Sequence, residues 1–198
     1  MKHTYLLFIS CILIINSSFG QTDDNFNNKF VIVLDVQEDY TNDMSPDSTV
    51  LSFINSVNYV IENTPKENVI YVVSLHKALF VSFKSIYVDT IVSLEMDTNL
   101  ILVNDNIFVK EDGNAFTVSS LVEYLNINNA KEIIVTGLLA EKCVYGTLIG
   151  GKKLGYDMYV VPEAIIGKST KSELKTLSKL AKKGVTILPL NDYLDIKK

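Results

Sequence analysis

A series of short apolar runs separated by helical patterns constrains the fold of this chain most strongly. The runs lie at residues 29–35 (KFVIVLD), 68–75 (NVIYVVSL), 107–110, 131–137, 156–161 and 185–190. They are apolar throughout, which is typical of strands that are buried on both faces. Such strands, when helices separate them, form a parallel sheet between two helical layers. We therefore predict a three-layer α/β/α, Rossmann-like fold with about six mostly parallel strands and helices on both faces.

Helices are predicted between these runs. Residues 49–61 carry apolar residues at helical spacing, and Pro65 lies just beyond them. Further helices are expected at 119–126 with Thr117 as its cap, at 141–154, and from a capping box of Thr170 and Glu173 to near Gly184.

Two segments leave alternatives open. Residues 77–105 are expected to form an insertion, either a hairpin or a wall over the site, unless their aromatic residues (Phe80, Phe83 and Tyr87) belong to the core. Glycines at 146, 150 and 151 weaken the helix at 141–154 by about 1 kcal/mol each relative to alanine. Either this helix approaches the sheet or a neighbouring subunit closely, or it is poorly formed.

The N-terminal end resembles a secretory signal peptide. Residues 1–20 carry a positive charge near their start at Lys2, continue with an apolar run that is too short to span a bilayer, and end in small residues. We expect cleavage near Gly20, a polar leader at 21–28, one domain at 29–198, and a secreted or periplasmic protein. A lipoprotein acylated at Cys11 is the less favoured alternative, and no other segment is long and apolar enough to cross a membrane.

Composition excludes several kinds of site. The net charge is −5, which does not favour nucleic acid as a partner. The chain has no arginine, so a guanidinium clamp on a substrate carboxylate or phosphate is excluded. Without the signal peptide, Cys143 is the only thiol and His76 the only imidazole. An intrachain disulfide and a zinc site with several histidines are therefore excluded, and we predict no metal and no cofactor.

Three polar residues lie where strands end: Asp35, Lys110 and, in the first turn of the next helix, Cys143. Taken singly, they fit a turn carboxylate, a surface lysine and a small buried residue. All three should nevertheless meet at the carboxyl rim of the sheet, where ligands bind. A helix N-terminus and a cation lower a thiol pKa, and a carboxylate can accept the thiol proton. Together they could form a cysteine nucleophile with its base.

The sequence resembles the isochorismatase-like cysteine hydrolases in three segments. These segments are LDVQEDY (34–40), KEDGNAF (110–116, with Asn114 where serine is common) and GLLAEKCVYGTLIGGKKLGYDMYVVPEA (137–164). The resemblance implies an Asp35–Lys110–Cys143 triad and a cis peptide at Leu138–Leu139. It further implies an oxyanion site made by the N–H groups of Leu139 or Ala140 and of Cys143. We place Gln37, Tyr40, His76 and Phe116 in the substrate pocket.

Departures from the family pattern narrow the expected activity. The loop after Tyr40 has no histidine, which disfavours a metal-dependent nicotinamidase, and Ala140 and Glu141 stand where threonine and aspartate are frequent. A cysteine nucleophile favours hydrolysis of a C–N bond in a small amide through a thioester. The alternatives are a His76–Cys143 thiol hydrolase and a non-catalytic binding or scaffold module. The resemblance also implies a homo-oligomer.

Overall fold

The computed structural model describes residues 28–44, 47–81 and 85–197. The predicted signal peptide (1–20) and residues 21–27 of the polar leader lie outside these ranges. The strands and longer helices are β1 (Lys29–Leu34), α1 (Glu38–Thr41), α2 (Asp47–Glu62), β2 (Val69–Ser74), β3 (His76–Val81), β4 (Ile86–Val92), β5 (Ile107–Lys110), α3 (Ser119–Ile127), β6 (Glu132–Leu138), α4 (Tyr145–Lys153), β7 (Asp157–Ile166), α5 (Thr170–Lys182) and β8 (Thr186–Ile187). The other helical elements are the 3₁₀ helices η2 (Lys66–Asn68), η3 (Ala115–Thr117) and η5 (Leu190–Lys197) and the π-helical turn η4 (Ala140–Val144).

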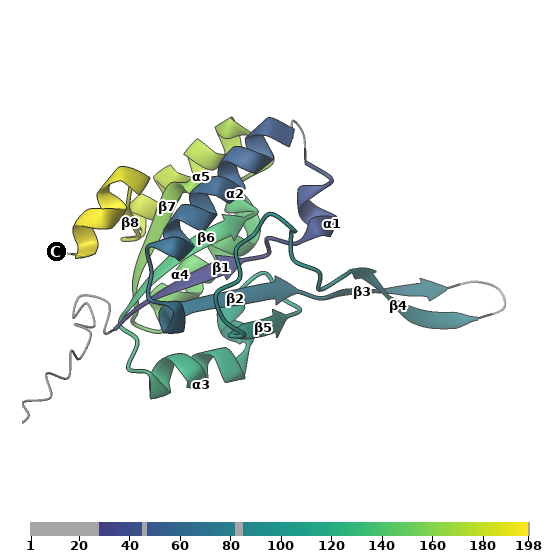
Figure 1. Ribbon diagram of the computed structural model, residues 1–198. Coiled ribbons are helices and arrows are strands. Elements are labelled where there is room, and N and C mark those ends of the chain that lie inside the picture. The colour runs from purple at the N-terminus through teal and green to yellow at the C-terminus, as the bar shows by residue number, and fades with distance from the viewer. Residues whose placement is uncertain (1–27, 45–46, 82–84, 198) are drawn as a thin grey trace, which may run out of the picture.

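The central sheet confirms the predicted fold class. Six strands pair in the order β5-β2-β1-β6-β7-β8, and every pair is parallel (Figure 1). The chain winds from β1 toward β5 on one side and from β6 toward β8 on the other. Strand order therefore reverses between β1 and β6, and the carboxyl ends of these two strands flank the expected ligand crevice.

Helices cover both faces of the sheet, each through an apolar stripe. The predicted stripe of α2 is buried, from Val50 at 7% exposure to Val57 and Ile61 at 0%, and it packs on one face together with Tyr193 of η5. Residues from α3, α4 and α5, including Leu121, Leu148 and Leu180, form the core on the other face. The amphipathic pattern of these segments thus positions the strands whose ends carry the polar residues.

The insertion is a hairpin that projects from the body of the protein. Strands β3 and β4 pair antiparallel and form a separate two-stranded sheet (Figure 1). Tyr87 is 53% exposed, so it does not belong to the core, while the side chain of Phe80 and the whole of Phe83 lie outside the described residues. At the base of the hairpin, the backbone N–H of Ser93 donates to Asp39 Oδ2 at 2.6 Å. The hairpin alternative is therefore confirmed.

Several predicted boundaries are wrong in detail. Val118, not Thr117, is the cap residue of α3, because Thr117 ends η3 and its hydroxyl donates to Asn114 O. The capping box of α5 is formed by Ser169 and Ser172, one residue before the predicted pair. The last strand is only two residues long, and β7 extends further than predicted.

No helix in the described part of the chain is long and apolar enough to cross a membrane.

Candidate active site

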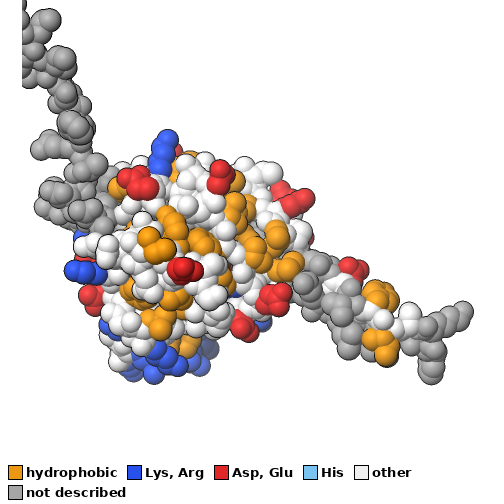
Figure 2. All heavy atoms as spheres, turned by 90° about the horizontal axis from the view of Figure 1, so that it is seen from below, with side chains coloured by type: hydrophobic (Ala, Val, Ile, Leu, Met, Phe, Trp, Pro, Cys, Tyr) orange, Lys and Arg blue, Asp and Glu red, His pale blue; other side chains and the backbone are white. Residues whose placement is uncertain are grey.

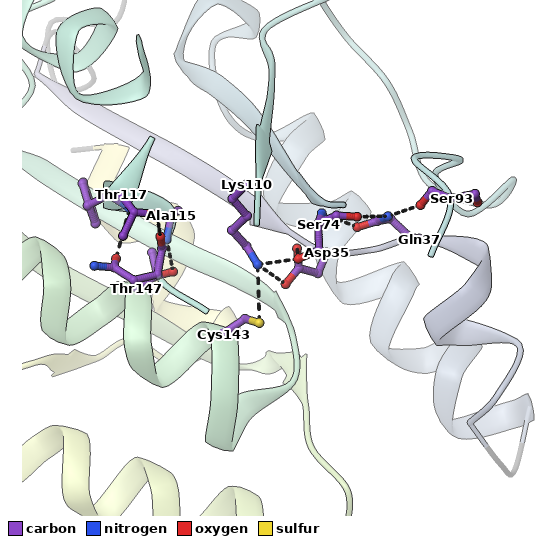
Figure 3. Close-up of polar contacts among 11 residues, drawn as sticks. Asp35, Gln37, Ser74, Ser93, Lys110, Ala115, Thr117, Cys143 and Thr147 are labelled. Carbon is purple, nitrogen blue, oxygen red and sulfur yellow. Dashed lines mark hydrogen bonds and ion pairs between the residues drawn. The ribbon is translucent and has the colours of Figure 1, made fainter. Parts of the chain in front are cut away.

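Three strand-end residues meet at the reversal point of the sheet, as the sequence predicts. Asp35 follows β1, Lys110 ends β5, and Cys143 lies in η4, directly after β6. Lys110 Nζ lies 2.9 Å from Asp35 Oδ2 and 3.4 Å from Cys143 Sγ, so the ammonium group bridges the carboxylate and the sulfur (Figure 3). Asp35 and Lys110 are 2% and 1% exposed. A buried ion pair of this kind therefore faces a half-buried thiol.

Ser74 completes the polar cluster from the end of β2. Its hydroxyl donates to Asp35 Oδ1 at 2.8 Å and accepts a hydrogen bond from Lys110 Nζ (Figure 3). A buried ion pair is stable only when additional hydrogen bonds satisfy its remaining polar atoms. Ser74 supplies such bonds to both charged groups and fixes their relative position.

The backbone around Asp35 directs its side chain into the site. Asp35 has φ 58°, a left-handed conformation that non-glycine residues rarely adopt, and its N–H donates to Val72 O at 2.8 Å. The neighbouring strand comes unusually close: a Cβ on Gly137 would lie 2.0 Å from Leu34 O. Only glycine fits there, so β6 can carry the Cys143 turn alongside the end of β1.

The electrostatic setting of Cys143 differs from the expectation of a lowered pKa. Burial raises the pKa of the thiol from 9.0 to about 11, the negative charge of Asp35 adds to the rise, and Lys110 opposes it. At neutral pH the sulfur therefore carries its proton. The nearby carboxylate, which disfavours a resting thiolate, is at the same time the group placed to accept that proton.

A cavity of about 240 Å³ opens in front of the sulfur. It is lined by Asp35, Tyr40, Gly113, Leu138, Leu139, Lys142 and Cys143. Burial and the charge of Asp35 raise the pKa of Tyr40 to about 12, so the phenol is neutral and can act as a hydrogen-bond donor. Tyr40 and Leu139 were predicted to lie at the site, and the structure brings both to the cavity wall.

Two residues predicted to line the substrate pocket lie elsewhere. Gln37 is fully buried, and its amide bonds to Ser74 N, Ser74 O and Ser93 O, so it clamps the base of the hairpin (Figure 3). Phe116 stacks on Tyr156, with ring centroids 5.5 Å apart, inside the core. Both assignments were wrong because a motif places a residue near the site but does not fix where its side chain points.

The other positions predicted for the site are Ala140, the Leu138–Leu139 peptide and His76. Ala140 begins η4 with its side chain in the core, and the Leu138–Leu139 peptide bond is cis as predicted. His76 is the first residue of β3, and its side chain is not among those that the structure describes. The thiol-hydrolase alternative required Lys110 to point away from the sulfur, and it instead points toward it.

Comparisons with known proteins assign the chain to a family. A model of the isochorismatase domain matches residues 29–192. The chain belongs to the isochorismatase family. This isochorismatase-family chain has the same fold as an isochorismatase family protein from Desulfovibrio vulgaris, with 16% identity, coverage of 85% of this chain and 97% of that one, and a TM-score of 0.69. No curated protein sequence matches it.

Two further solved structures share the isochorismatase-family fold. A pyrazinamidase of Pyrococcus horikoshii in complex with zinc is 20% identical over 82% of this chain and 99% of that one, with a TM-score of 0.59. The YcaC gene product of Escherichia coli, described as an octameric hydrolase of unknown specificity, is 16% identical over 82% of this chain and 76% of that one, with a TM-score of 0.58. The family places this chain among hydrolases.

The zinc of the pyrazinamidase raises the question of a metal in this family member. Among the residues described here, no group of three or more His, Cys, Asp or Glu side chains could hold a metal ion. The one carboxylate at the cavity, Asp35, is already paired with Lys110. The described donors therefore do not fit a metal, and no chemical step is derived through one.

The glycines of α4 explain how the nucleophile turn packs. A Cβ on Gly146 would lie 2.6 Å from Gly113 O, and one on Gly151 would lie 2.3 Å from the sulfur of Met158 in β7. The helix thus approaches both the loop after Lys110 and the sheet, which confirms the close-approach alternative. This packing brings Gly113 to the cavity beside Cys143.

Sequence reasoning missed Ser74, Gly113 and Lys142. Ser74 had the clearest signal, because it is a hydroxyl at the end of a buried strand on the rim that carries Asp35 and Lys110. Lys142 is exposed and lines the cavity beside the sulfur. Nothing in the sequence distinguishes it from other surface lysines.

Proposed function

We propose that this chain hydrolyses the C–N bond of a small amide-type substrate through a thioester on Cys143. The observation that carries the proposal is the position of Lys110 Nζ, within 2.9 Å of Asp35 Oδ2 and 3.4 Å of Cys143 Sγ. This ion pair lies at a cavity large enough for a small molecule. A base, a cation and a nucleophile therefore meet at one place where a carbonyl group could bind.

The first half of the proposed reaction forms the thioester. Asp35 accepts the Cys143 proton while the sulfur attacks the carbonyl carbon, and Lys110 stabilises the developing thiolate. N–H groups at the start of a helix have no intrahelical acceptor. Those of Leu139 or Ala140 and of Cys143 are the proposed donors to the oxyanion. The C–N bond then breaks, and the nitrogen leaves as ammonia or an amine with the proton from Asp35.

The second half regenerates the enzyme. Asp35, again a carboxylate, accepts a proton from water as the water oxygen attacks the thioester carbonyl. The C–S bond breaks, the sulfur recovers the proton, and a carboxylic acid leaves. The raised thiol pKa fits this cycle, since the sulfur is a thiol between turnovers and is deprotonated only as it attacks.

Ammonia release across a panel of small primary amides tests the proposal, with Cys143→Ala as the matched control. We expect release with the wild-type protein and none above background with Cys143→Ala. Equal rates for both proteins on every amide would reject the cysteine mechanism. A biological activity that survives Cys143→Ala would favour the non-catalytic binding module.

The place of action and the assembly state are part of the proposal. The apolar N-terminal stretch supports a secreted or periplasmic protein, which N-terminal sequencing of material from an exporting host would test.

The octameric relative supports a homo-oligomer. The hairpin residues Ile86 and Tyr87 are 68% and 53% exposed, and Figure 2 shows hydrophobic side chains on the projecting hairpin and on the face beside it. Light scattering after gel filtration would measure the mass of the particle.

A further inference from the structure

A second cavity adjoins the one in front of Cys143. It has a volume of about 610 Å³, and its lining includes Tyr40, Met44, Val50, Leu138, Leu139 and Ile166. Three of these residues (Tyr40, Leu138 and Leu139) also line the smaller cavity. The two cavities therefore share one wall, and the cis Leu138–Leu139 peptide belongs to it.

The lining of the second cavity is apolar at its buried end and polar at its exposed end. Val50 and Ile166 are 7% and 6% exposed, and Met44 is half-buried. Asp43, Lys168 and Thr170 are exposed to solvent. Ile166 of β7 is the register partner of Leu138 of β6, so this buried apolar residue lies beside the shared wall. A substituent of the substrate that extends from Cys143 along this wall would contact apolar side chains.

Hydrogen bonds hold in place the part of the cavity wall that follows β7. Glu173 Oε1 accepts from the N–H of Gly167 at 2.9 Å, and Glu141 Oε1 accepts from the N–H of Lys168 at 3.2 Å. Glu141 belongs to η4, the same turn that carries Cys143. The turn of the nucleophile and the wall of the second cavity are therefore connected directly, and the cavity is formed before any ligand binds.

The sizes of the cavities indicate what could fill them. Pockets for drug-sized ligands occupy roughly 300–1,000 Å³. At about 240 Å³, the cavity in front of Cys143 suits little more than the amide group and a few further atoms. The second cavity has more than twice that volume. A substrate confined to the first cavity would leave the larger cavity and its apolar residues unfilled.

We propose that the second cavity binds an apolar chain attached to the amide, so that the preferred substrates are elongated amides with a hydrocarbon part. This inference rests on the proposed function for its chemistry. Val50, Met44 and Ile166 then determine specificity by contacting the chain. Each buried CH₂ group should raise kcat/KM about fourfold until the cavity is filled.

The first test compares acetamide, butanamide and hexanamide as substrates, with N-hexylacetamide to show on which side of the carbonyl the chain lies. We expect kcat/KM to rise either from acetamide to hexanamide or from acetamide to N-hexylacetamide. Met44→Trp and Thr49→Trp would fill the cavity from the loop after α1 and from α2, and both should reduce the ratio of kcat/KM for hexanamide to that for acetamide at least tenfold. Ser52→Trp is the matched control, because Ser52 is exposed on α2 and does not line the cavity.

The second test does not depend on turnover. Iodoacetamide and N-hexyl iodoacetamide alkylate a thiol with loss of iodide and a proton, and intact-mass spectrometry measures both rates at Cys143. We expect faster labelling by the hexyl reagent, and loss of that preference in Met44→Trp and Thr49→Trp but not in Ser52→Trp. If no amide is hydrolysed but this preference holds, the proposed function fails and the apolar subsite stands. Equal labelling rates in the wild-type protein, or a preference that survives both filling variants, would overturn the subsite.

Discussion

Replacing Asp35 with asparagine separates two effects of this residue: it raises the pKa of the Cys143 thiol, and it is the proposed general base. With a pKa of about 11, roughly one Cys143 thiol in 3,000 is ionised at pH 7.5, whereas a pKa of 9.0 would ionise about one in 30. Asp35 raises this pKa, so Asp35→Asn should lower it and increase the thiolate fraction. Because burial is the largest cause and remains, the gain in thiolate should be about tenfold.

Hydrolysis should change in the opposite direction. Removing the general base should lower kcat by about 10²–10⁴-fold, although the thiolate is more abundant. The assay is iodoacetamide labelling of Cys143 between pH 6 and pH 11, beside ammonia release by the same protein preparations. Slower labelling of Asp35→Asn at pH 7.5, or unchanged hydrolysis, would refute the reasoning. Thermal unfolding serves as the control, since a Lys110 left without its carboxylate partner costs about 3–5 kcal/mol.

Four other changes have defined outcomes. Lys110→Met should slow Cys143 labelling at pH 8, because the ammonium lowers the thiol pKa; faster labelling would contradict this. Gly146→Ala should lower the free energy of unfolding by about 1–3 kcal/mol in urea denaturation, despite its better helix propensity, because the new Cβ would lie 2.6 Å from Gly113 O. Gln37→Leu should increase hydrogen exchange at residues 74–93, since three hydrogen bonds are lost; unchanged exchange would exclude the clamp. Wild-type labelling should keep rising up to about pH 11, and a plateau near pH 8.5 would show a thiol without the raised pKa.

The fold and the meeting of the three strand-end residues could be predicted because both follow from the order of the elements. Continuous apolar runs separated by amphipathic helices leave a parallel sheet as the way to bury every strand. In such a sheet the carboxyl ends of β1, β5 and β6 lie on one rim. Asp35, Lys110 and Cys143 were therefore expected on the same rim, and the strand order β5-β2-β1-β6 then brings them together.

Side-chain direction and burial could not be predicted in the same way. Gln37 lies only two residues from Asp35, yet its amide turns away from the cavity to the base of the hairpin. Helix starts are similarly ambiguous, because Ser169 and Thr170 are both good caps and the backbone selects one. The raised thiol pKa depends on how much of Cys143 is desolvated, and a one-dimensional pattern does not give that quantity.

The second cavity could not be predicted from the sequence for a related reason. Its walls include Met44 and Val50 on one side and Ile166 and Glu173 on the other, which are far apart in the chain and meet only through the packing of the fold. Neither segment carries a motif that indicates a ligand. A subsite of this kind becomes visible only when the three-dimensional arrangement is known.

The central claim is that Cys143 carries the acyl group of the substrate during turnover. Acid quenching within the first turnovers, followed by peptide mapping with mass spectrometry, measures this directly for any amide that the protein hydrolyses. The account predicts an adduct of the acyl mass on the peptide that contains Cys143, and loss of both adduct and hydrolysis in Cys143→Ala. Hydrolysis by Cys143→Ala at the wild-type rate, or an acyl group on a different residue, would contradict it.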